Sequence, residues 1–383
     1  MCIRYIPLES RGGPSVIKLA VSLLSPFIIL IYSPKFNRAT LWLSLYFIAV
    51  LFSALFNSEQ FRYSTILYLL SFLLYFQAYY NLIYNEKALS LDYFIKVLQG
   101  LILAFTVVLL LQQASIVMGV KVLPIINLTQ ILDRGIGANS LGGEPSTSAR
   151  ILTVAFLCLM RMYELKLDIS ALTPRMIFRE NRWVTIGFLW SMVTMGSGTA
   201  FVGLILLSLY FFKRQHLAVI APLFVALYFI APHIEHTQFQ RAYSIMGAMT
   251  TLDADAVRDA DGSGATRIVP LLNTIHNTDL TEAKTWFGEG ESHDHWLKDI
   301  HTGKTKLGTM STYGLLSYII SLGFVFSCVI RLFSLETILF FAGMAGATGN
   351  IAYHWGLIML LATSKYFMDN YLETKENKSC NRK

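Results

Sequence analysis

Long apolar segments follow one another along most of this 383-residue chain, and they restrict the folds open to it more than any other feature. A helix needs about 20 mostly apolar residues to cross the hydrocarbon core of a bilayer. A further apolar stretch, 183–212, is too long for one straight helix, and its MGSGT sequence (Met195–Thr199) predicts a break between two short helices. We therefore predict an all-α polytopic membrane protein with about 11 transmembrane helices, in the range of about 10 to 12. The remaining apolar segments are 15–32, 40–57, 63–85, 93–118, 148–163, 217–233, 311–330 and 351–368, with a weaker glycine-rich candidate at 334–349.

The charge content supports a membrane setting and argues against a nucleic-acid partner. Only 14% of the residues are charged, whereas a soluble domain carries about 25%. The formal net charge is +7, but the lysines and arginines gather in short loops and in the tail Lys375–Lys383, where positive charge marks the cytoplasmic side. The four cysteines are far apart, so we expect neither a disulfide framework nor a metal knuckle.

The same positive charge predicts which loops face which side of the membrane. The basic loop 161–182 and the basic pair at 213–214 are both expected to be cytoplasmic, which requires two crossings between them. Loops 119–147 and 234–310 then lie outside, and the C-terminal tail lies inside. Counting back places the basic N-terminus outside, against the charge rule, so its side stays open.

These assignments divide the chain into six parts. They are N-terminal transmembrane helices at 1–118, a first extracytoplasmic loop at 119–147, central transmembrane helices at 148–233 with the break at 195–199, a large extracytoplasmic loop or cap at 234–310, C-terminal transmembrane helices at 311–368, and a cytoplasmic tail at 369–383.

The first outside loop ends in DRGIGANSLGGEPSTSAR (Asp133–Arg150), which predicts a tight, irregular backbone leading into a helix. The five glycines of 119–147 and Pro145 disfavour a helix before that point. The serines and threonine at 146–148 are predicted to cap the helix, since both residue types favour that position. Arg150 lies inside the start of an apolar segment, where a charge is costly and usually functional. A capped surface turn is the alternative interpretation.

The second outside loop, 234–310, is long and polar, and loops of this kind are usually functional or disordered. Its tryptophans predict some packing, so we expect a small cap with short helices. Six of the eight histidines lie in or beside it, including His293 and His295 in WFGEGESHDH (Trp286–His295). Adjacent residues rarely point at one ion, so no metal site is expected there. Histidine titrates near neutral pH and is a natural general base, although a solvated histidine is the simpler alternative.

Three passages, taken in order, resemble the O-antigen polymerase (Wzy-type) and O-antigen ligase superfamily of bacterial envelope glycan assembly. GGEPSTSARIL (Gly142–Leu152) is similar to the family's Glu-Pro-Ser passage, where an outside loop re-enters the membrane. MGSGTAFVGLILL (Met195–Leu207) is similar to its serine/glycine helix break and the small-residue-rich helix that follows. Arg267, then FGEGESHDH (Phe287–His295) and STYGLLSYIISLGF (Ser311–Phe324), is similar to its late loop and next helix.

The resemblance implies a metal-independent membrane glycosyltransferase without a cofactor, in the bacterial inner membrane and with its active site facing the periplasm. Its donor would be a growing glycan on undecaprenyl pyrophosphate. A polymerase would transfer that glycan to another lipid-linked repeat unit, and a ligase would transfer it to lipid A-core. Its other partners would be membrane lipid and a chain-length regulator protein, with no nucleic acid.

The resemblance also implies a set of site residues. Guanidinium groups are permanently charged, bidentate partners for phosphate. The family's polar position near the late loop matches more than one histidine here, including His301, so the general base stays open. The implied residues are Arg134, Arg150 and Arg267 for the pyrophosphate, with Arg241 in reserve, Glu144 to orient an arginine or act as base, and His293 or His295 as the competing base.

A transporter or flippase is the alternative from a different class, and a sensory or structural membrane protein with a binding cap is another. A transporter is expected to carry charged residues along its spans, and often two matching halves. The chain has no detectable internal repeat, and its predicted spans are nearly free of charge in their middles. These features favour the glycosyltransferase.

Overall fold

The computed structural model describes residues 23–32, 36–59, 61, 63–119, 135–211, 240, 243–244, 247, 255, 262–276, 278–290, 308–344, 348–349 and 352–380, without the side chains of 262–268, 308–309 and 373–380. Within these ranges there are 13 α-helices and no strand. Four helical segments are long and apolar enough to cross a membrane: Arg38–Phe56, Tyr63–Asn85, Leu91–Val117 and Met310–Val329. The prediction of an all-helical chain with several possible membrane spans is therefore confirmed in this coarser form.

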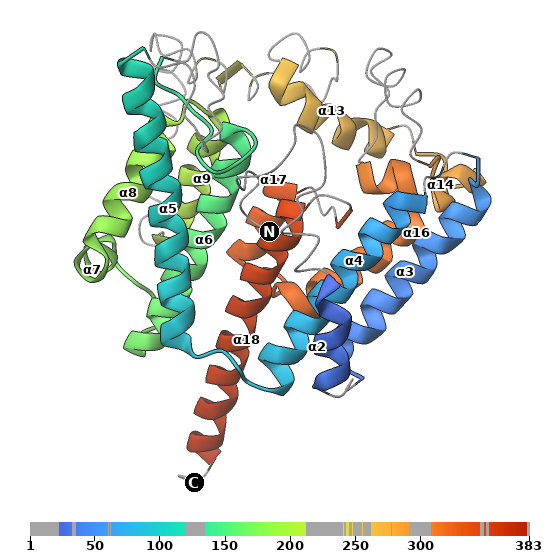
Figure 1. Ribbon diagram of the computed structural model, residues 1–383, viewed down its shortest axis with the longest axis horizontal. Helices are drawn as coiled ribbons and strands as arrows, with labels where there is room; N and C mark the ends of the chain where they lie inside the picture. Colours follow the sequence, from blue (N-terminus) through green and yellow to red (C-terminus); the bar gives the residue numbers. More distant parts are fainter. Residues whose placement is uncertain are drawn as a thin grey trace.

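The helices follow the apolar segments closely (Figure 1). In chain order they are α2 (Ser25–Ile31), α3 (Arg38–Phe56), α4 (Tyr63–Tyr80) with the π-helical turn η1 (Asn81–Asn85), α5 (Leu91–Val117), α6 (Pro145–Leu167), α7 (Pro174–Glu180), α8 (Arg182–Thr194), α9 (Gly198–Ser208) with the 3-10 turn η2 (Leu209–Phe211), α13 (Gly262–His276), α14 (Ala283–Phe287), α16 (Gly308–Phe324) with the π-helical turn η5 (Val325–Val329), α17 (Leu335–Met344) and α18 (Ala352–Cys380).

The predicted break in the long apolar stretch is confirmed. α8 ends at Thr194, α9 begins at Gly198, and Gly196 between them has a φ of 71°. The two helices are 13 and 11 residues long, and α17 has only 10, so none of them reaches the length of about 20 residues that a straight span needs. The predicted span at 217–233 lies outside the described residues. The predicted cap helices are present as α13 and α14 in the late loop.

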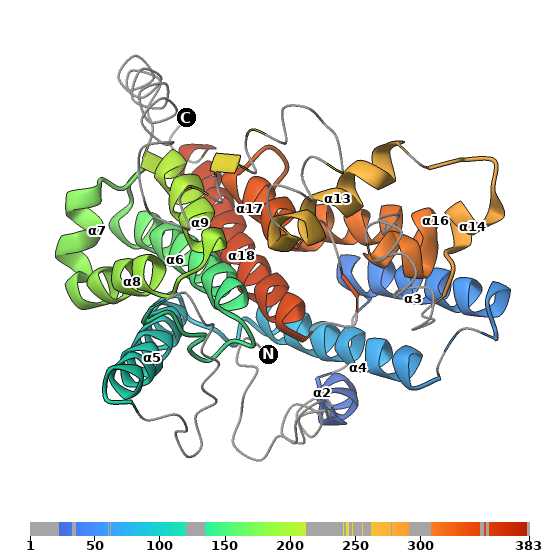
Figure 2. The same ribbon diagram turned by 90° about the horizontal axis from the view of Figure 1, so that it is seen from above.

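α18 runs between two groups of helices, with α5, α6, α8 and α9 on one side and α3, α4 and α16 on the other (Figures 1 and 2). It is joined to the second group by aromatic side chains. Trp355 of α18 stacks on Phe72 of α4 with the ring centroids 6.1 Å apart, and it also packs against Phe324 of α16 at 6.2 Å. Phe76 of α4 in turn meets Phe324 edge-on at 5.0 Å. Trp355, Phe76 and Phe324 are almost fully buried. Their rings therefore form a packed centre that holds α18, α4 and α16 together.

α6 and α18 lie side by side and run in the same direction. Arg150 contacts Tyr353 near the start of both helices, the Cys158 thiol donates to the Leu360 carbonyl two turns further along, and Asp168 contacts Tyr371 at the far end of α6. The number of residues between successive contacts is nearly the same on the two helices. Both N-termini therefore lie at the same end of the bundle, on the side of α13 in Figure 1, while α18 leads to the C-terminus at the opposite end.

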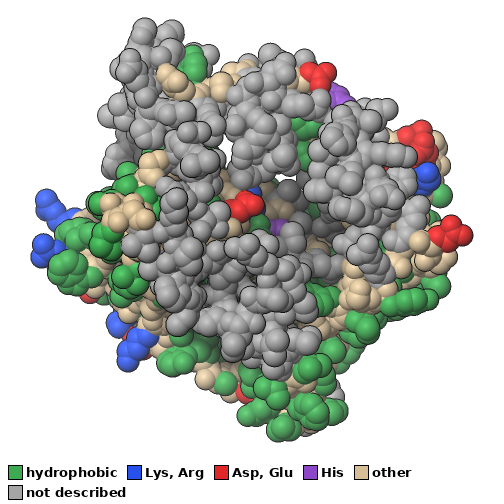
Figure 3. Space-filling view, turned by 45° about the horizontal axis from the view of Figure 1, so that its top comes forward, with side chains coloured by type: hydrophobic (Ala, Val, Ile, Leu, Met, Phe, Trp, Pro, Cys, Tyr) green, Lys and Arg blue, Asp and Glu red, His purple; other side chains and the backbone are tan. Residues whose placement is uncertain are grey.

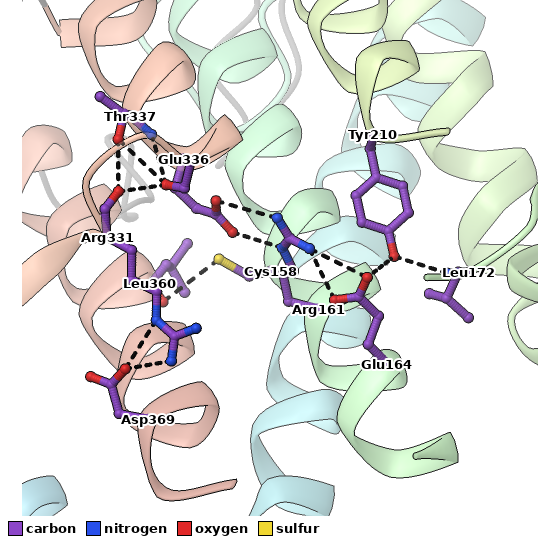
Figure 4. Close-up of polar contacts among 11 residues, drawn as sticks. Cys158, Arg161, Glu164, Leu172, Tyr210, Arg331, Glu336, Thr337, Leu360 and Asp369 are labelled. Carbon is purple, nitrogen blue, oxygen red and sulfur yellow. Dashed lines mark hydrogen bonds and ion pairs between the residues drawn. The ribbon is translucent and has the colours of Figure 1, made fainter. Parts of the chain in front are cut away.

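Near that opposite end, four side chains form a buried group that we call the inner charge cluster: Arg161, Glu164, Tyr210 and Glu336 (Figure 4). Arg161 Nε donates to Glu336 Oε1 at 2.8 Å, and its Nη1 donates to Glu164 Oε2 at 3.1 Å. The Tyr210 hydroxyl donates to Glu164 Oε1 at 2.5 Å. The cluster ties α6 to α17 and to the turn that ends α9.

A second ionic contact holds the linker before α17 against α18. Arg331 Nε donates to Asp369 Oδ1 at 3.0 Å, and Lys365 Nζ donates to Asp369 Oδ2 at 3.1 Å. Ser334 accepts from the Thr337 amide at 3.4 Å at the start of α17. The first turn of α17 is therefore fixed from both sides, by α6 through Glu336 and by α18 through Arg331 (Figure 4).

The position of Arg161 corrects one expectation from the sequence, namely that a loop begins at 161. Instead α6 continues to Leu167, and Arg161 lies about 16 Å along it from Arg150, at a rise of about 1.5 Å per residue. The side chains of Arg161, Glu164 and Glu336 are only 19%, 8% and 9% exposed. The helix can continue because each charge has a partner inside the bundle.

Replacing Arg161 with methionine is expected to destabilise the protein strongly. It removes the positive charge but leaves Glu164 and Glu336 buried, and breaking a buried ion pair in this way costs about 3 to 5 kcal/mol. The midpoint of thermal unfolding in one detergent would measure the loss. The double variant Arg161→Met/Glu336→Met should recover part of it, because it leaves one carboxylate fewer without a counter-charge.

Arg179→Met is the matched control for this substitution. Arg179 is 75% exposed, and its one ion pair among the described residues is with its chain neighbour Glu180 at 3.3 Å, so water and salt screen the pair and little stability depends on it. Equal midpoints for Arg161→Met and Arg179→Met would contradict the structural role of the cluster.

Candidate functional site

The GGEPSTS passage (142–148) folds back on itself where the first outside loop enters α6. The Asn139 side chain donates to the Gly142 carbonyl at 2.7 Å, and the Gly142 amide donates to Ser148 Oγ at 3.1 Å. Asn139 and Ser148 are fully buried. A Cβ atom at Gly142 would lie 2.3 Å from Ser148 Oγ, so only glycine fits this close approach. The prediction of an irregular backbone is confirmed for the described part of the loop.

α5 binds the same loop through hydrogen bonds from one glutamine side chain. The Ser140 amide donates to Gln112 Oε1 at 2.7 Å, and Gln112 Nε2 donates to the Ser140 carbonyl at 3.3 Å. The Ser140 hydroxyl donates to the Phe105 carbonyl at 2.5 Å. Such bonds replace the water that a surface loop would use, and they allow the loop to be buried in the bundle.

The predicted capping by residues 146–148 is wrong in its details. α6 begins at Pro145, one position after Glu144, and Glu144 makes no side-chain capping bond. Proline takes the first helical position because its fixed φ suits it and it has no amide hydrogen to satisfy there. Ser148 is already inside the helix, and its hydroxyl bonds back to the loop instead of capping the end.

Arg150 lies at the start of α6 and faces the first turn of α18. Its Nη1 donates to the Tyr353 hydroxyl at 2.8 Å, and its Nε is buried without a hydrogen-bond partner among the described residues. His354 follows on α18, with its ring 4.4 Å from the Tyr353 ring and within the electrostatic reach of Arg150. We call Arg150, Tyr353 and His354 the α6–α18 site.

The surroundings of the α6–α18 site favour a negatively charged ligand. The N-terminus of a helix carries a partial positive charge, and here two parallel helices present that end together. Arg150 adds a full positive charge that no described carboxylate neutralises. Figure 3 shows that this face of the molecule is hollowed near its centre, where acidic, basic and histidine side chains are visible. The arrangement suits an anion with several oxygen atoms, such as a phosphate or diphosphate.

Glu144 lies apart from Arg150, although both belong to the start of α6. Arg150 follows Glu144 by six positions, which places it about 9 Å further along the helix axis, and Glu144 is the extended residue just before the helix. Glu144 is exposed, and Ser146 Oγ donates to its Oε2 at 3.3 Å. Glu144 therefore does not orient Arg150 in this structure.

The other predicted site residues are not brought together by the described part of the chain. Arg134, Arg241, His293 and His295 lie outside the described residues. Arg267 belongs to α13, and its side chain is not described. Their convergence on Arg150 stays a prediction. Among the described residues, no group of three or more His, Cys, Asp or Glu side chains is arranged to hold a metal ion.

Tyr353 and His354 are the site residues that the sequence did not indicate. Both belong to the last apolar segment, 351–368. Within the apolar segments, only charged residues near the ends were considered as candidates. The available signal was a polar pair, Tyr-His, in the first turn of a helix whose next two turns are apolar. Nothing in the sequence predicts that α18 packs against α6, so the partner of Arg150 could not be identified.

The FGEG motif of the late loop (Phe287–Gly290) lies against the STYG motif of α16 (Ser311–Gly314). The Glu289 amide donates to the Ser311 carbonyl at 2.8 Å, and the Gly290 amide donates to the Thr312 carbonyl at 3.2 Å. Gly288 and Gly314 have φ values of 77° and 85°, a region that side chains disfavour. A Cβ atom at Gly314 would lie 2.2 Å from the Trp286 carbonyl oxygen.

α3 completes this contact from its last turn. Asn57 Nδ2 donates to the Gly288 carbonyl at 3.1 Å, and Phe56 stacks on Phe287 with the ring centroids 4.2 Å apart. The late loop is thus fixed to α3 and α16 at Gly290, three residues before His293.

No protein-family model, curated protein or solved structure matches this chain.

Replacing Gly314 with alanine is expected to disrupt the contact between the late loop and α16. The new Cβ would collide with the Trp286 carbonyl, and alanine disfavours the positive φ, so we expect a loss of about 2 to 4 kcal/mol in the free energy of unfolding. Thermal unfolding in detergent would measure it, and limited proteolysis should show faster cleavage in the late loop.

Gly100→Ala is the matched control. Gly100 lies inside α5, and a Cβ atom added there would meet nothing within 4 Å, while alanine favours a helix over glycine by about 1 kcal/mol. This variant should be as stable as the parent protein or slightly more so. Equal behaviour of the two variants would count against the close contact at Gly314.

Proposed function

We propose that this protein is an integral membrane glycosyltransferase that uses a polyprenyl-diphosphate-linked glycan as donor, and specifically an O-antigen polymerase. It joins undecaprenyl-pyrophosphate-linked repeat units into a surface polysaccharide at the periplasmic face of the bacterial inner membrane. In this proposal it has about 11 transmembrane helices, requires neither a metal ion nor a cofactor, and works with a chain-length regulator protein.

The observation that carries the proposal is the position of Arg150. A guanidinium group at the start of two parallel helices, with Nε buried and unpartnered among the described residues, is an incomplete polar site. Such sites persist in proteins when a ligand or ordered water completes them. A diphosphate supplies the negative charge and the oxygen acceptors that the arginine and the helix ends favour.

The reaction needs positioning and charge stabilisation more than strong acid or base chemistry. A hydroxyl oxygen of the acceptor sugar attacks the anomeric carbon of the donor, and a new C–O bond forms. The bond between that carbon and the phosphate oxygen breaks, and the diphosphate leaves with the electron pair, while the hydroxyl proton passes to a base. Arg150 would stabilise the charge that develops on the leaving diphosphate. Glu144, His293 and His295 stay candidates for the base.

The surface of the helices suits a substrate that carries a long apolar chain. Large apolar side chains on the outer faces are well exposed, among them Phe52 and Leu55 on α3 and Val107 and Leu111 on α5. In a bilayer these faces contact acyl chains, and the prenyl chain can lie among them while the diphosphate reaches the α6–α18 site. We place that end of the bundle at the outer face, because the late-loop helices α13 and α14 lie there too.

An O-antigen ligase is the alternative that shares the donor and differs in the acceptor, which would be lipid A-core. A lipid or oligosaccharide transporter is the alternative from another class. The inner charge cluster is the observation that favours a transporter, because buried charges often mark a transport path. Its groups are paired with one another, however, which also fits a structural role.

The proposal predicts that Arg150→Ala abolishes polymerisation while the protein stays in the membrane. In a strain lacking the gene, this variant should give lipopolysaccharide capped with a single repeat unit, because the donor diphosphate has lost its main charge partner. Arg150→Lys should give shorter or fewer chains, since an ammonium group keeps the charge without the Nε–H and the planar fork. Lipopolysaccharide gels and immunoblots of the membrane fraction are the measurements.

Arg179→Ala is the control, because this arginine is exposed on α7, which lies at the outer edge of the bundle in Figure 1. It should support full-length chains. Full-length chains with Arg150→Ala would refute the assignment of Arg150. Loss of every O-unit from the lipopolysaccharide in the deletion strain would favour the ligase, and accumulation of lipid-linked units on the cytoplasmic face would favour the transporter.

A further inference from the structure

His354 is the least satisfied polar group of the α6–α18 site. It is only 5% exposed, and its Nδ1 is buried without a hydrogen-bond partner among the described residues. Leaving such an atom unpaired carries a desolvation penalty that an apolar residue at the same position would avoid. A buried polar atom without a partner at the start of a helix therefore indicates a ligand that is bound there during function.

Arg150 and His354 bring two buried atoms without a described partner to the start of two neighbouring helices, α6 and α18. Arg150 Nη1 donates to the Tyr353 hydroxyl at 2.8 Å, which helps to hold the guanidinium group, while its Nε has no partner among the described residues. The His354 ring packs edge-on against the same Tyr353 ring at 4.4 Å and lies within the electrostatic reach of Arg150. Trp355 Nε1 donates to the Gly349 carbonyl at 3.0 Å, which ties the entrance of α18 to its first turn.

The two atoms differ in what they can bind. The Nε–H of arginine is always a donor, whereas the Nδ1 of an uncharged imidazole accepts when the proton is on Nε2. With the proton of His354 on Nε2, a ligand that satisfies both atoms must offer an acceptor oxygen to Arg150 and a hydroxyl donor to His354. A fully ionised bare diphosphate offers only acceptors. A sugar attached to a phosphate offers phosphate oxygens and, close to them, a hydroxyl group.

We propose that Arg150 Nε and His354 Nδ1 together bind a glycosyl phosphate, with the phosphate on Arg150 and a hydroxyl group of the attached sugar on His354. This inference rests on the proposed function and adds a specificity to it. His354 distinguishes the glycosylated carrier, which is the substrate, from the bare carrier diphosphate, which is the product. The site would then hold the donor and release the spent carrier once the sugar has been transferred. Tyr353 is a positioning residue that acts through Arg150.

The test is a binding measurement with the full-length protein in nanodiscs and two probes. One probe is undecaprenyl diphosphate, and the other is the same lipid with one N-acetylhexosamine on the diphosphate. The protein is expected to bind the glycosylated probe about tenfold more tightly, the effect of roughly one buried hydrogen bond. His354→Phe keeps the ring shape and removes both nitrogens, so the preference should disappear while the affinity for the bare probe stays the same.

A second variant separates binding from folding. In His354→Asn the amide reaches roughly the position of Nδ1, so this variant should keep most of the preference. Both variants should have a thermal unfolding midpoint in detergent at least as high as that of the parent protein. Tyr353→Phe should weaken both probes equally, because it loosens Arg150 rather than the sugar contact. Arg150→Ala should lose both probes.

The outcomes separate the two proposals. If the parent protein binds both probes equally, or if His354→Phe weakens both to the same extent, the assignment of His354 is refuted while the role of Arg150 stands. If the parent protein binds neither probe, the proposed function is refuted together with it. If Arg150→Ala retains binding of the bare probe, Arg150 is not the phosphate ligand.

Discussion

The parallel packing of α6 against α18 is the constraint on which the rest of this structure depends. Two adjacent helices in one direction bring two positive ends to the same side of the bundle, which costs electrostatic energy unless an anion or compensating contact is present there. Three contacts maintain the register, from Arg150–Tyr353 at one end to Asp168–Tyr371 at the other. Near the far end, the inner charge cluster joins the same α6 to α17. The pair of helices thus links the α6–α18 site, where Arg150 has no described carboxylate partner, to a region of paired charges within the bundle.

The helices could be predicted from the sequence because lipid-exposed and buried apolar runs both favour long helices, and the glycines at 195–199 marked the break between α8 and α9 correctly. The position of Arg150 near the start of an apolar helix could be predicted as well, and a charge there is rare. Arg161 could not be placed inside the bundle, because its partner Glu336 is 175 residues away and positive charge near a segment end is normally a cytoplasmic signal. Tyr353 and His354 were missed for the same reason: their role depends on which helix packs beside α18, and no local pattern encodes that choice.

The three passages that resembled a known superfamily have three separate structural explanations. Gly142 allows the first loop to approach Ser148, Gly196 interrupts an apolar stretch, and Gly314 lets the late loop lie directly on α16. Each glycine answers a local backbone requirement. The chemical argument therefore depends less on these motifs than on the side chains that they position, of which Arg150 and His354 have polar atoms with no described partner.

The unbroken course of α6 also has an evolutionary consequence. Arg150 and Arg161 stand on one rigid helix, and each must meet a fixed partner on a different neighbour. Inserting or deleting a single residue between them would turn one end relative to the other by about 100° and shift it by about 1.5 Å. Either Tyr353 or Glu336 would then lose its arginine. The number of residues in this stretch should therefore stay constant among descendants of this gene, while changes of length accumulate in the loops, where no such pair of distant contacts must be satisfied at once.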